Sequence, residues 1–272
     1  MIRDTSLESG NELLQTLESF SNLPISLPLG HLSKADQFKH IVHSEQLKPQ
    51  FCNVFQKELI YFSYGGIFHR HSALPKEDPK GLPIAFLFAP SLLKQIDDFY
   101  AFDTGAAVSG KFGSAISPHT HQNILEKYSF PGDRTHEVPR RLVQFFYGSN
   151  RAYLEGSLLE PTESLPSYYQ RSFEVLAHDL SDLEVDHRQR IIECQAKENI
   201  PLADKLIWVG YHQSQELEVI ELKKLLRKVP RDLQFKTFPY TWHKRYTPNE
   251  IAGFLMKEVE ETMIEIYMNL EE

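Results

Sequence analysis

The chain has 272 residues, of which 41% are hydrophobic and 24% are charged, a composition typical of a folded protein rather than a disordered one. The formal net charge of −8 argues against tight, sequence-independent binding to nucleic acid, because such binding depends on cationic side chains that displace counterions from phosphates. No stretch reaches the roughly 20 apolar residues that span a bilayer, and the first residues lack the basic-then-apolar order of a secretion signal. We therefore expect a cytoplasmic protein without a membrane partner.

Hydrophobic patterning predicts strands in the middle of the chain with helices around them. Apolar residues at helical spacing predict helices over 7–20, 90–96, 119–128, 173–180, 216–229 and about 248–270. Apolar or extended runs predict strands over 25–32, 59–62, 83–88, 191–194, 206–211 and 233–238. Residues 140–147 fit either a helix or a strand. Because strands and helices do not alternate regularly, the pattern indicates an α+β fold, which we expect to form a single domain over 1–272.

Two places along this pattern are suited to holding an anion. His31 ends an extended segment just before a helix that Ser33 is expected to cap, and the amides and dipole of a helix start favour negative charge. The strand over 59–62 reads as buried on both faces. Gly65 and Gly66 end it with a turn that allows close approach of a ligand, and a basic tip with Arg70 follows. A turn with only a structural role, followed by basic residues exposed to solvent, explains the segment from Gly65 to Arg70 equally well.

The two cysteines, Cys52 and Cys194, lie far apart and form neither a CxxC motif nor a disulfide framework. This usage is typical of a reducing compartment, so both thiols are expected to be buried and unpaired. The histidine pairs at 69/71 and 119/121 have a spacing that metal sites sometimes use. Neither pair has an acidic third ligand nearby in the sequence, so we expect no metal.

Several common catalytic motifs are missing, namely GxGxxG, the P-loop, GxSxG and HExxH. Residues 103–106, DTGA, match the aspartic-protease signature, in which a carboxylate shares a proton with a second one. The chain holds no second copy of this motif. Asp103 is therefore expected to cap a turn.

Glu193 is the most informative acidic residue, because it stands in an apolar run between Ile191 and Cys194. A carboxylate is costly to bury unless it has partners or a catalytic task. Two interpretations stay open at this point. Glu193 forms a structural salt bridge with Arg188 or Arg190, or it belongs to an active site.

Three segments resemble parts of the ADP-ribosyltransferase fold. GHLSKADQFKHIVHSEQLKP (30–49) is similar to the opening of that fold, where a histidine ends the first strand and a helix follows. IYFSYGG (60–66) is similar to its second strand, with an aromatic residue followed by a serine. DHRQRIIECQAKENIPLADKLIWVGYH (186–212) resembles the strand that carries the catalytic glutamate in DNA-modifying ADP-ribosyltransferase toxins. The three segments cover about a fifth of the chain.

The resemblance implies a split β-sheet core with flanking helices and NAD as the substrate. It implies that Glu193 is catalytic, because a carboxylate stabilises the positive charge that develops on the ribose as nicotinamide leaves. It also implies that His31 holds the adenosine-side ribose, that Tyr61 packs the nicotinamide and that Ser63 belongs to the same NAD-binding strand. Arg70 would pair with the pyrophosphate.

The function implied is that of an NAD-dependent ADP-ribosyltransferase, a bacterial toxin or phage-defence effector that modifies nucleic acid or protein. An antitoxin or a second copy of the chain would be its partner. Family members with two such glutamates carry Gln or Glu two positions before the catalytic one, where this chain has Ile191, so transfer to arginine or acidic side chains is in doubt. Two alternatives remain: an NAD-dependent RNA 2′-phosphotransferase of the same fold, and a nucleotide-binding sensor without turnover.

Overall fold

The structure is a computed structural model that describes residues 14, 17–67, 79–109, 125, 128–131, 136–159, 191–228, 235–241 and 246–267. Its strands are β1 Leu29–Lys34, β2 Gln46–Leu47, β3 Gln50–Cys52, β4 Lys57–Tyr64, β5 Pro83–Phe88, β6 Asp98–Tyr100, β7 Phe130–Pro131, β8 Glu193–Ala196, β9 Ile200–Pro201, β10 Leu206–His212 and β11 Lys236–Tyr240. Its α-helices are α2 Ala35–Ser44, α3 Thr104–Val108, α5 Val138–Phe146, α6 Asn150–Glu155, α8 Glu216–Leu226 and α9 Pro248–Tyr267. Short 3-10 helices span Pro79–Gly81, Pro90–Gln95 and Gln213–Gln215.

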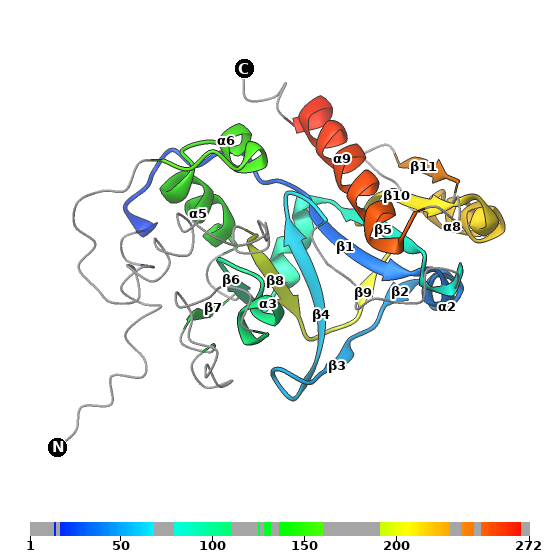
Figure 1. Cartoon of the computed structure of the whole chain (residues 1–272). Helices are drawn as coiled ribbons and strands as arrows, with labels where there is room; N and C mark the ends of the chain where they lie inside the picture. The colour runs from blue at the N-terminus through cyan, green and yellow to red at the C-terminus, as the bar shows by residue number, and fades with distance from the viewer. Residues whose placement is uncertain are drawn as a thin grey trace.

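A nine-stranded mixed sheet lies at the centre, in the order β11-β10-β5-β1-β4-β8-β6-β7, with β3 paired to β4 beside this path (Figure 1). Strands β10 and β11 run parallel, and the other described pairs in this sheet are antiparallel. The apolar run of β5 is buried at every residue, as a strand in the middle of a covered sheet must be. This arrangement confirms the α+β class.

Helices cover both faces of the sheet near β5 and β10. A Cβ added at Gly210 of β10 would lie 2.8 Å from the side chain of Leu255, so α9 packs closely against this face. Gly210 pairs with Ala85, and the next residue along β5, Phe86, therefore points to the opposite face. There the ring of Phe38 from α2 lies 5.8 Å from the ring of Phe86. The two helices thus pack on opposite sides of one strand pair.

Strands β1 and β4 separate partway along their length, which opens the sheet. Strand β1 pairs with β5 from Leu29 to Lys34, but its described pairing with β4 is at Leu29 and Gly30. A Cβ at Gly30 would collide with the carbonyl oxygen of Gly66, so β1 lies closely against the turn that follows β4 at this point. Beyond Gly30 the two strands diverge.

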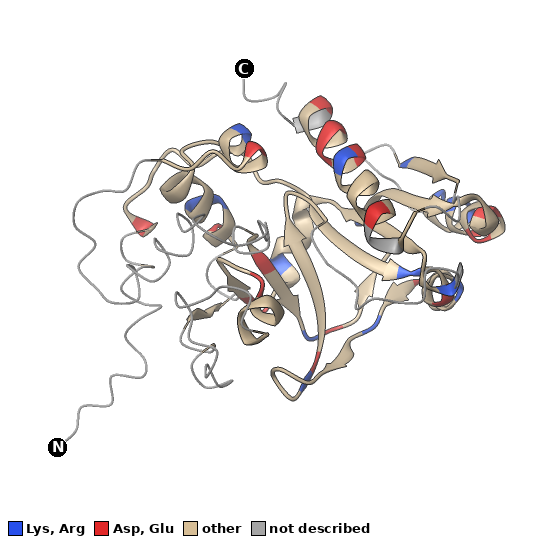
Figure 2. Cartoon of the chain, viewed as in Figure 1, with Lys and Arg blue, Asp and Glu red and all other residues tan. Residues whose placement is uncertain are grey.

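In the described part of the chain, Figure 2 shows charged residues along the helices and near the ends of strands. Strands β5 and β10 contain no Asp, Glu, Lys or Arg. Glu193 is an exception among the charged residues, because it is buried inside the sheet. It lies at the start of β8 with 6% of its surface exposed. Within the described helices, none is both long and apolar enough to cross a membrane.

Several predicted elements agree with the structure and others are corrected. The strands over 83–88 and 206–211 are present, and residues 140–147 lie mostly in a helix, α5. The helix predicted over 216–229 ends earlier, at Leu226, and the helix predicted over about 248–270 is described from Pro248 to Tyr267. The strand predicted over 191–194 begins later, at Glu193. The strand predicted over 233–238 is described as β11 from Lys236 to Tyr240, and residues 233 and 234 lie outside the described residues. The predicted helices over 119–128 and 173–180, and most of 7–20, lie outside the described residues, although Leu14 and Leu17 are helical.

The prediction that Ser33 caps the following helix is wrong. Ser33 lies in β1, where it pairs with Ile84, and the cap residue of α2 is Lys34, which makes no side-chain capping bond. The sheet pairing continues through Lys34. Strand pairing therefore overrides the local preference of a serine for the helix start.

Candidate functional site

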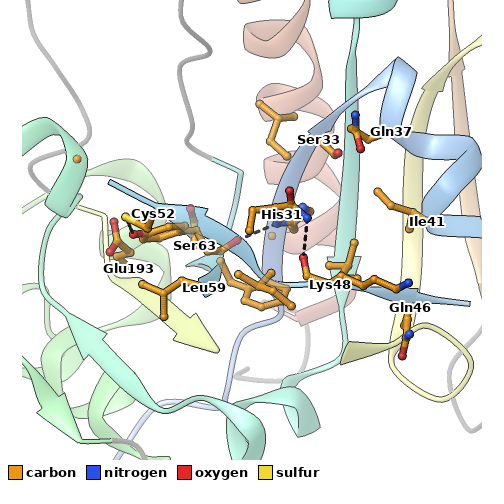
Figure 3. Close-up of a pocket in the computed structure, with 18 of the residues that line it drawn as sticks. His31, Ser33, Gln37, Ile41, Gln46, Lys48, Cys52, Leu59, Ser63 and Glu193 are labelled. Atoms are coloured by element: carbon orange, nitrogen blue, oxygen red, sulfur yellow. Dashed lines mark hydrogen bonds between the residues drawn. The ribbon is translucent and has the colours of Figure 1, made fainter. Parts of the chain in front are cut away.

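A cavity of about 450 Å³ lies at the opening between β1 and β4, a size within the range of small-molecule sites. Residues of β1, α2, β4 and β8 line it, together with the start of α3. Figure 3 shows Glu193 and Ser63 toward one end of the cavity, His31 near its middle, and Gln37 and Ile41 of α2 toward the other end. The cavity therefore extends from a buried carboxylate to a helix surface.

The structure brings most of the site residues selected from the sequence to this one cavity. Four of them line it: His31, Tyr61, Ser63 and Glu193. Arg70 lies outside the described residues, as do Arg188 and Arg190, the salt-bridge partners considered for Glu193. The roles of the four lining residues remain predictions, but their common location is a structural fact.

Strand register explains how residues so distant in the sequence meet. Gly30 of β1 pairs with Ser63 of β4, and Ser63 pairs in turn with Glu193 of β8, so the three residues form one row across the sheet. Tyr61 lies two residues before Ser63 and projects from the same face of β4. The next residue of β1 after this row is His31, at the point where the strands diverge.

The carboxylate of Glu193 accepts three hydrogen bonds from described donors. The backbone N–H of Thr104 donates to Oε2 at 3.0 Å, and the hydroxyl of Thr104 donates to Oε1 at 2.8 Å. The side-chain amide of Gln195 also donates to Oε1, at 2.7 Å. Donors from two separate elements thus hold the carboxylate in one orientation.

Burial raises the pKa of the Glu193 carboxyl well above its usual range, and the nearby negative charge of Asp103 raises it further. The hydrogen bonds from Gln195 and Thr104 lower this pKa in part, because they favour the ionised form. The net direction is upward. Glu193 consequently loses its proton at a higher pH than an exposed glutamate does.

The sequence predicts that Asp103 caps a turn, and in the structure it caps the start of helix α3. Its side chain accepts a hydrogen bond from the backbone N–H of Ala106 at 2.6 Å. Asp103 is 9% exposed and also lines the cavity with its neighbour Gly105. The motif over 103–106 therefore contributes to the cavity, which the prediction of a turn cap did not include.

His31 spans the opening between the two strands. Its Nδ1 lies 2.8 Å from the backbone oxygen of Tyr61. Because a carbonyl oxygen only accepts hydrogen bonds, Nδ1 carries the proton and Nε2 is the acceptor of the neutral ring. The ring packs near Phe62 and Phe86, at centroid distances of 5.6 and 6.0 Å. These contacts fix the orientation of the imidazole.

Tyr61 connects the site to Cys52, since its hydroxyl donates a hydrogen bond to Cys52 Sγ at 2.7 Å. Burial is the main cause that raises the pKa of the Tyr61 hydroxyl, and the negative charge of Glu193 raises this pKa further. Tyr61 and Ser63 are half-buried because they face the cavity, so the strand is not buried on both faces throughout. Cys194 is buried as expected, but Cys52 is half-buried and lines the cavity. Both are free thiols.

Sequence reasoning missed Gln195 and Thr104, the two residues that hold Glu193. Gln195 could have been found from strand alternation, because it lies two positions after Glu193 and faces the same side of β8. Thr104 is 89 positions away from Glu193, and no local pattern connects them. In the described part of the chain, no group of three or more His, Cys, Asp or Glu could hold a metal ion; the histidine pairs at 69/71 and 119/121 lie outside it.

No protein-family model matches the sequence, and a search of curated proteins finds no match. Two solved structures of DarT from Thermus sp. 2.9 are similar in fold. The structure of DarT in complex with NAD+ has a TM-score of 0.41 at 10% identity and covers 79% of this chain and 97% of that chain. The structure in complex with ADP-ribosylated ssDNA has a TM-score of 0.40 at 10% identity and covers 80% and 96% of the two chains.

Proposed function

We propose that this chain is an NAD-dependent ADP-ribosyltransferase, with NAD as its substrate. The observation that carries the proposal is the cavity at the opening between β1 and β4. Four residues that line it come from the three sequence segments that resemble the ADP-ribosyltransferase fold. These residues are His31, Tyr61, Ser63 and Glu193. The cavity volume of about 450 Å³ supports a ligand of nucleotide size.

In the proposed reaction, the bond between the ribose and nicotinamide breaks and its electron pair leaves with nicotinamide. Positive charge develops on the ribose, and the carboxylate of Glu193 stabilises it. Thr104 and Gln195 already hold this carboxylate by hydrogen bonds. Little reorganisation is then needed at the moment of reaction, which is the condition under which electrostatic stabilisation is most effective.

The other lining residues are proposed to bind and orient NAD. Nε2 of His31 accepts a hydrogen bond from a hydroxyl of the adenosine-side ribose, since Nδ1 is directed at the carbonyl of Tyr61. The ring of Tyr61 packs against the nicotinamide, beside Ser63 in the same strand. Arg70, which follows β4 in the sequence, is proposed to meet the pyrophosphate.

The acceptor is proposed to be nucleic acid or a protein group other than arginine or an acidic side chain. Ile191 lies two positions before Glu193 and lines the cavity, so this position presents no polar group to an acceptor. The similarity of residues 186–212 to DNA-modifying toxins supports a role as a bacterial toxin or phage-defence effector.

Labelled NAD tests the proposal, with bacterial DNA, RNA and protein supplied separately as acceptors. We expect the wild type to release nicotinamide and label one of them, and Glu193→Gln to be slower by about 10²- to 10³-fold. Glu58→Gln is the matched control, because Glu58 is an exposed residue of β4 that does not line the cavity. Equal activity in Glu193→Gln would contradict the proposal.

The same experiment separates the alternatives. A sensor would be stabilised by NAD against thermal unfolding and would form no product. An RNA 2′-phosphotransferase would produce ADP-ribose cyclic phosphate when 2′-phosphorylated RNA is added.

A further inference from the structure

We propose that Asp103 is a second catalytic residue of this cavity and acts as the general base that takes the proton from the acceptor. The inference rests on the transferase function proposed above. Capping of α3 accounts for the position of Asp103, but it does not account for its negative charge.

Asp103 and Glu193 reach the cavity from different elements. Tyr100 of β6 pairs with Glu193 of β8, so the start of α3, a few residues after Tyr100, is held beside Glu193. Thr104, the residue after Asp103, contacts Glu193 directly. Of the described residues that line the cavity, Asp103 and Glu193 are those with carboxylates.

A neutral cap would serve the helix equally well. Asparagine and serine stabilise a helix start about as strongly as aspartate does. The charge of Asp103 has a cost at this place, because it opposes the ionisation of Glu193. A carboxylate that is kept at a cavity wall despite such a cost is a candidate for a chemical role.

The polar groups that donate hydrogen bonds to the carboxylate of Glu193 are already engaged with it. Thr104 and Gln195 donate their hydrogen bonds to Glu193, and Ile191 offers none. The reaction requires two separate roles, and the cavity has two carboxylates to fill them. Glu193 stabilises the charge on the ribose, while Asp103 receives the proton that the acceptor must lose.

The proposed step balances without any further reactant. The bond between ribose and nicotinamide breaks, and its electron pair leaves with nicotinamide, which departs as a neutral molecule. A lone pair on an oxygen or nitrogen of the acceptor forms the new bond to the same ribose carbon. The proton of that atom passes to a carboxylate oxygen of Asp103 and then to water.

The variant that tests this role is Asp103→Asn, which keeps an oxygen to accept from the N–H of Ala106 but cannot take a proton. Asp103→Ser is a second variant that also retains a capping acceptor, so the test survives if one of the two fails to fold. Asp36→Asn is the matched control, since Asp36 is an exposed residue in the first turn of α2 and does not line the cavity.

The measurement is the partition of cleaved NAD between an acceptor and water, with labelled NAD and bacterial DNA, RNA and protein supplied separately. We expect Asp103→Asn to lower the share that reaches the acceptor by about 10²-fold or more, which is the usual contribution of a general base. Glu193→Gln should slow total cleavage and leave the partition unchanged. Asp36→Asn should change neither quantity.

An unchanged partition in both Asp103 variants would overturn this inference and leave the transferase function intact. Slower cleavage with an unchanged partition would have the same meaning, since Asp103 would then act through Glu193 or NAD binding. A wild type that cleaves NAD but labels none of the three acceptors would also overturn it. A wild type that does not cleave NAD would contradict the proposed function itself, and the role of Asp103 with it.

Discussion

Thr104 donates two hydrogen bonds to the carboxylate of Glu193, one from its backbone N–H at 3.0 Å and one from its hydroxyl at 2.8 Å. Thr104 is fully buried at the start of α3, 89 positions before Glu193 in the sequence. A buried carboxylate without partners would be costly. The contact therefore links the stability of this part of the fold to the residue proposed for catalysis.

Replacing Thr104 with valine removes the hydroxyl donor and keeps the size of the side chain. We expect Thr104→Val to lower the free energy of unfolding by about 1–3 kcal/mol, because Oε1 of Glu193 loses one of its donors. Nicotinamide release should also slow. Urea unfolding and a nicotinamide assay check both effects. Thr104→Ser, which restores a hydroxyl, should recover most of each loss, and no recovery would show that the methyl packing matters instead.

The raised pKa of Glu193 makes stability depend on pH in a defined direction. In the unfolded chain this carboxyl ionises near its ordinary value, whereas in the folded protein it keeps its proton to a higher pH. Between these two values the folded state binds more protons, so the free energy of unfolding falls as the pH rises. Below the ordinary value and above the raised one, this contribution is constant.

Glu193→Gln should remove this part of the pH dependence, because glutamine does not titrate. Urea unfolding at a series of pH values would measure it. The stability of the variant relative to the wild type should increase as the pH rises above the ordinary carboxyl pKa. A constant difference between the two proteins would show that the folded state does not raise this pKa.

Asp103→Asn should shift the pH dependence of NAD cleavage toward lower pH. The charge of Asp103 helps to raise the pKa of Glu193, so its removal allows Glu193 to ionise at a lower pH. The acid limb of the rate profile for nicotinamide release reports this ionisation. An acid limb that stays in place, or moves to higher pH, would exclude an electrostatic connection between the two carboxyl groups.

Gly30→Ala should strongly destabilise the protein. The added Cβ would collide with the backbone oxygen of Gly66, and a backbone atom cannot move aside as easily as a side chain. We therefore expect the free energy of unfolding to fall by about 1–3 kcal/mol. Gly253→Ala in α9 is the control, because a Cβ there has no atom within 4 Å. It should stabilise the helix by about 0.5–1 kcal/mol. Thermal unfolding of both variants tests the close approach of β1 to the turn after β4.

Strong local patterns predicted several parts of this molecule. The apolar runs over 83–88 and 206–211 are strands β5 and β10, because a continuous apolar segment of this length suits the middle of a covered sheet. Glu193 stood out because a carboxylate is rare in such a run. The capping role of Asp103 followed from the preference of aspartate for turns, although the element that it caps is a helix.

Features that depend on distant pairing could not be predicted in the same way. Thr104 meets Glu193 because β6 pairs with β8, and nothing near Thr104 in the sequence indicates that pairing. Ser33 has the chemistry of a cap, but the pairing of β1 with β5 holds it in the sheet. The cavity itself exists because β1 and β4 diverge after Gly30, which is a property of the whole sheet.

A crystal structure with a carba analogue of NAD, which cannot release nicotinamide, tests the central claim most directly. The account predicts that the analogue lies in the opening between β1 and β4, with its nicotinamide-side ribose in hydrogen-bonding contact with the carboxylate of Glu193 and its other ribose at His31. A bound analogue whose nicotinamide-side ribose lies away from Glu193, or at another surface of the protein, would contradict it.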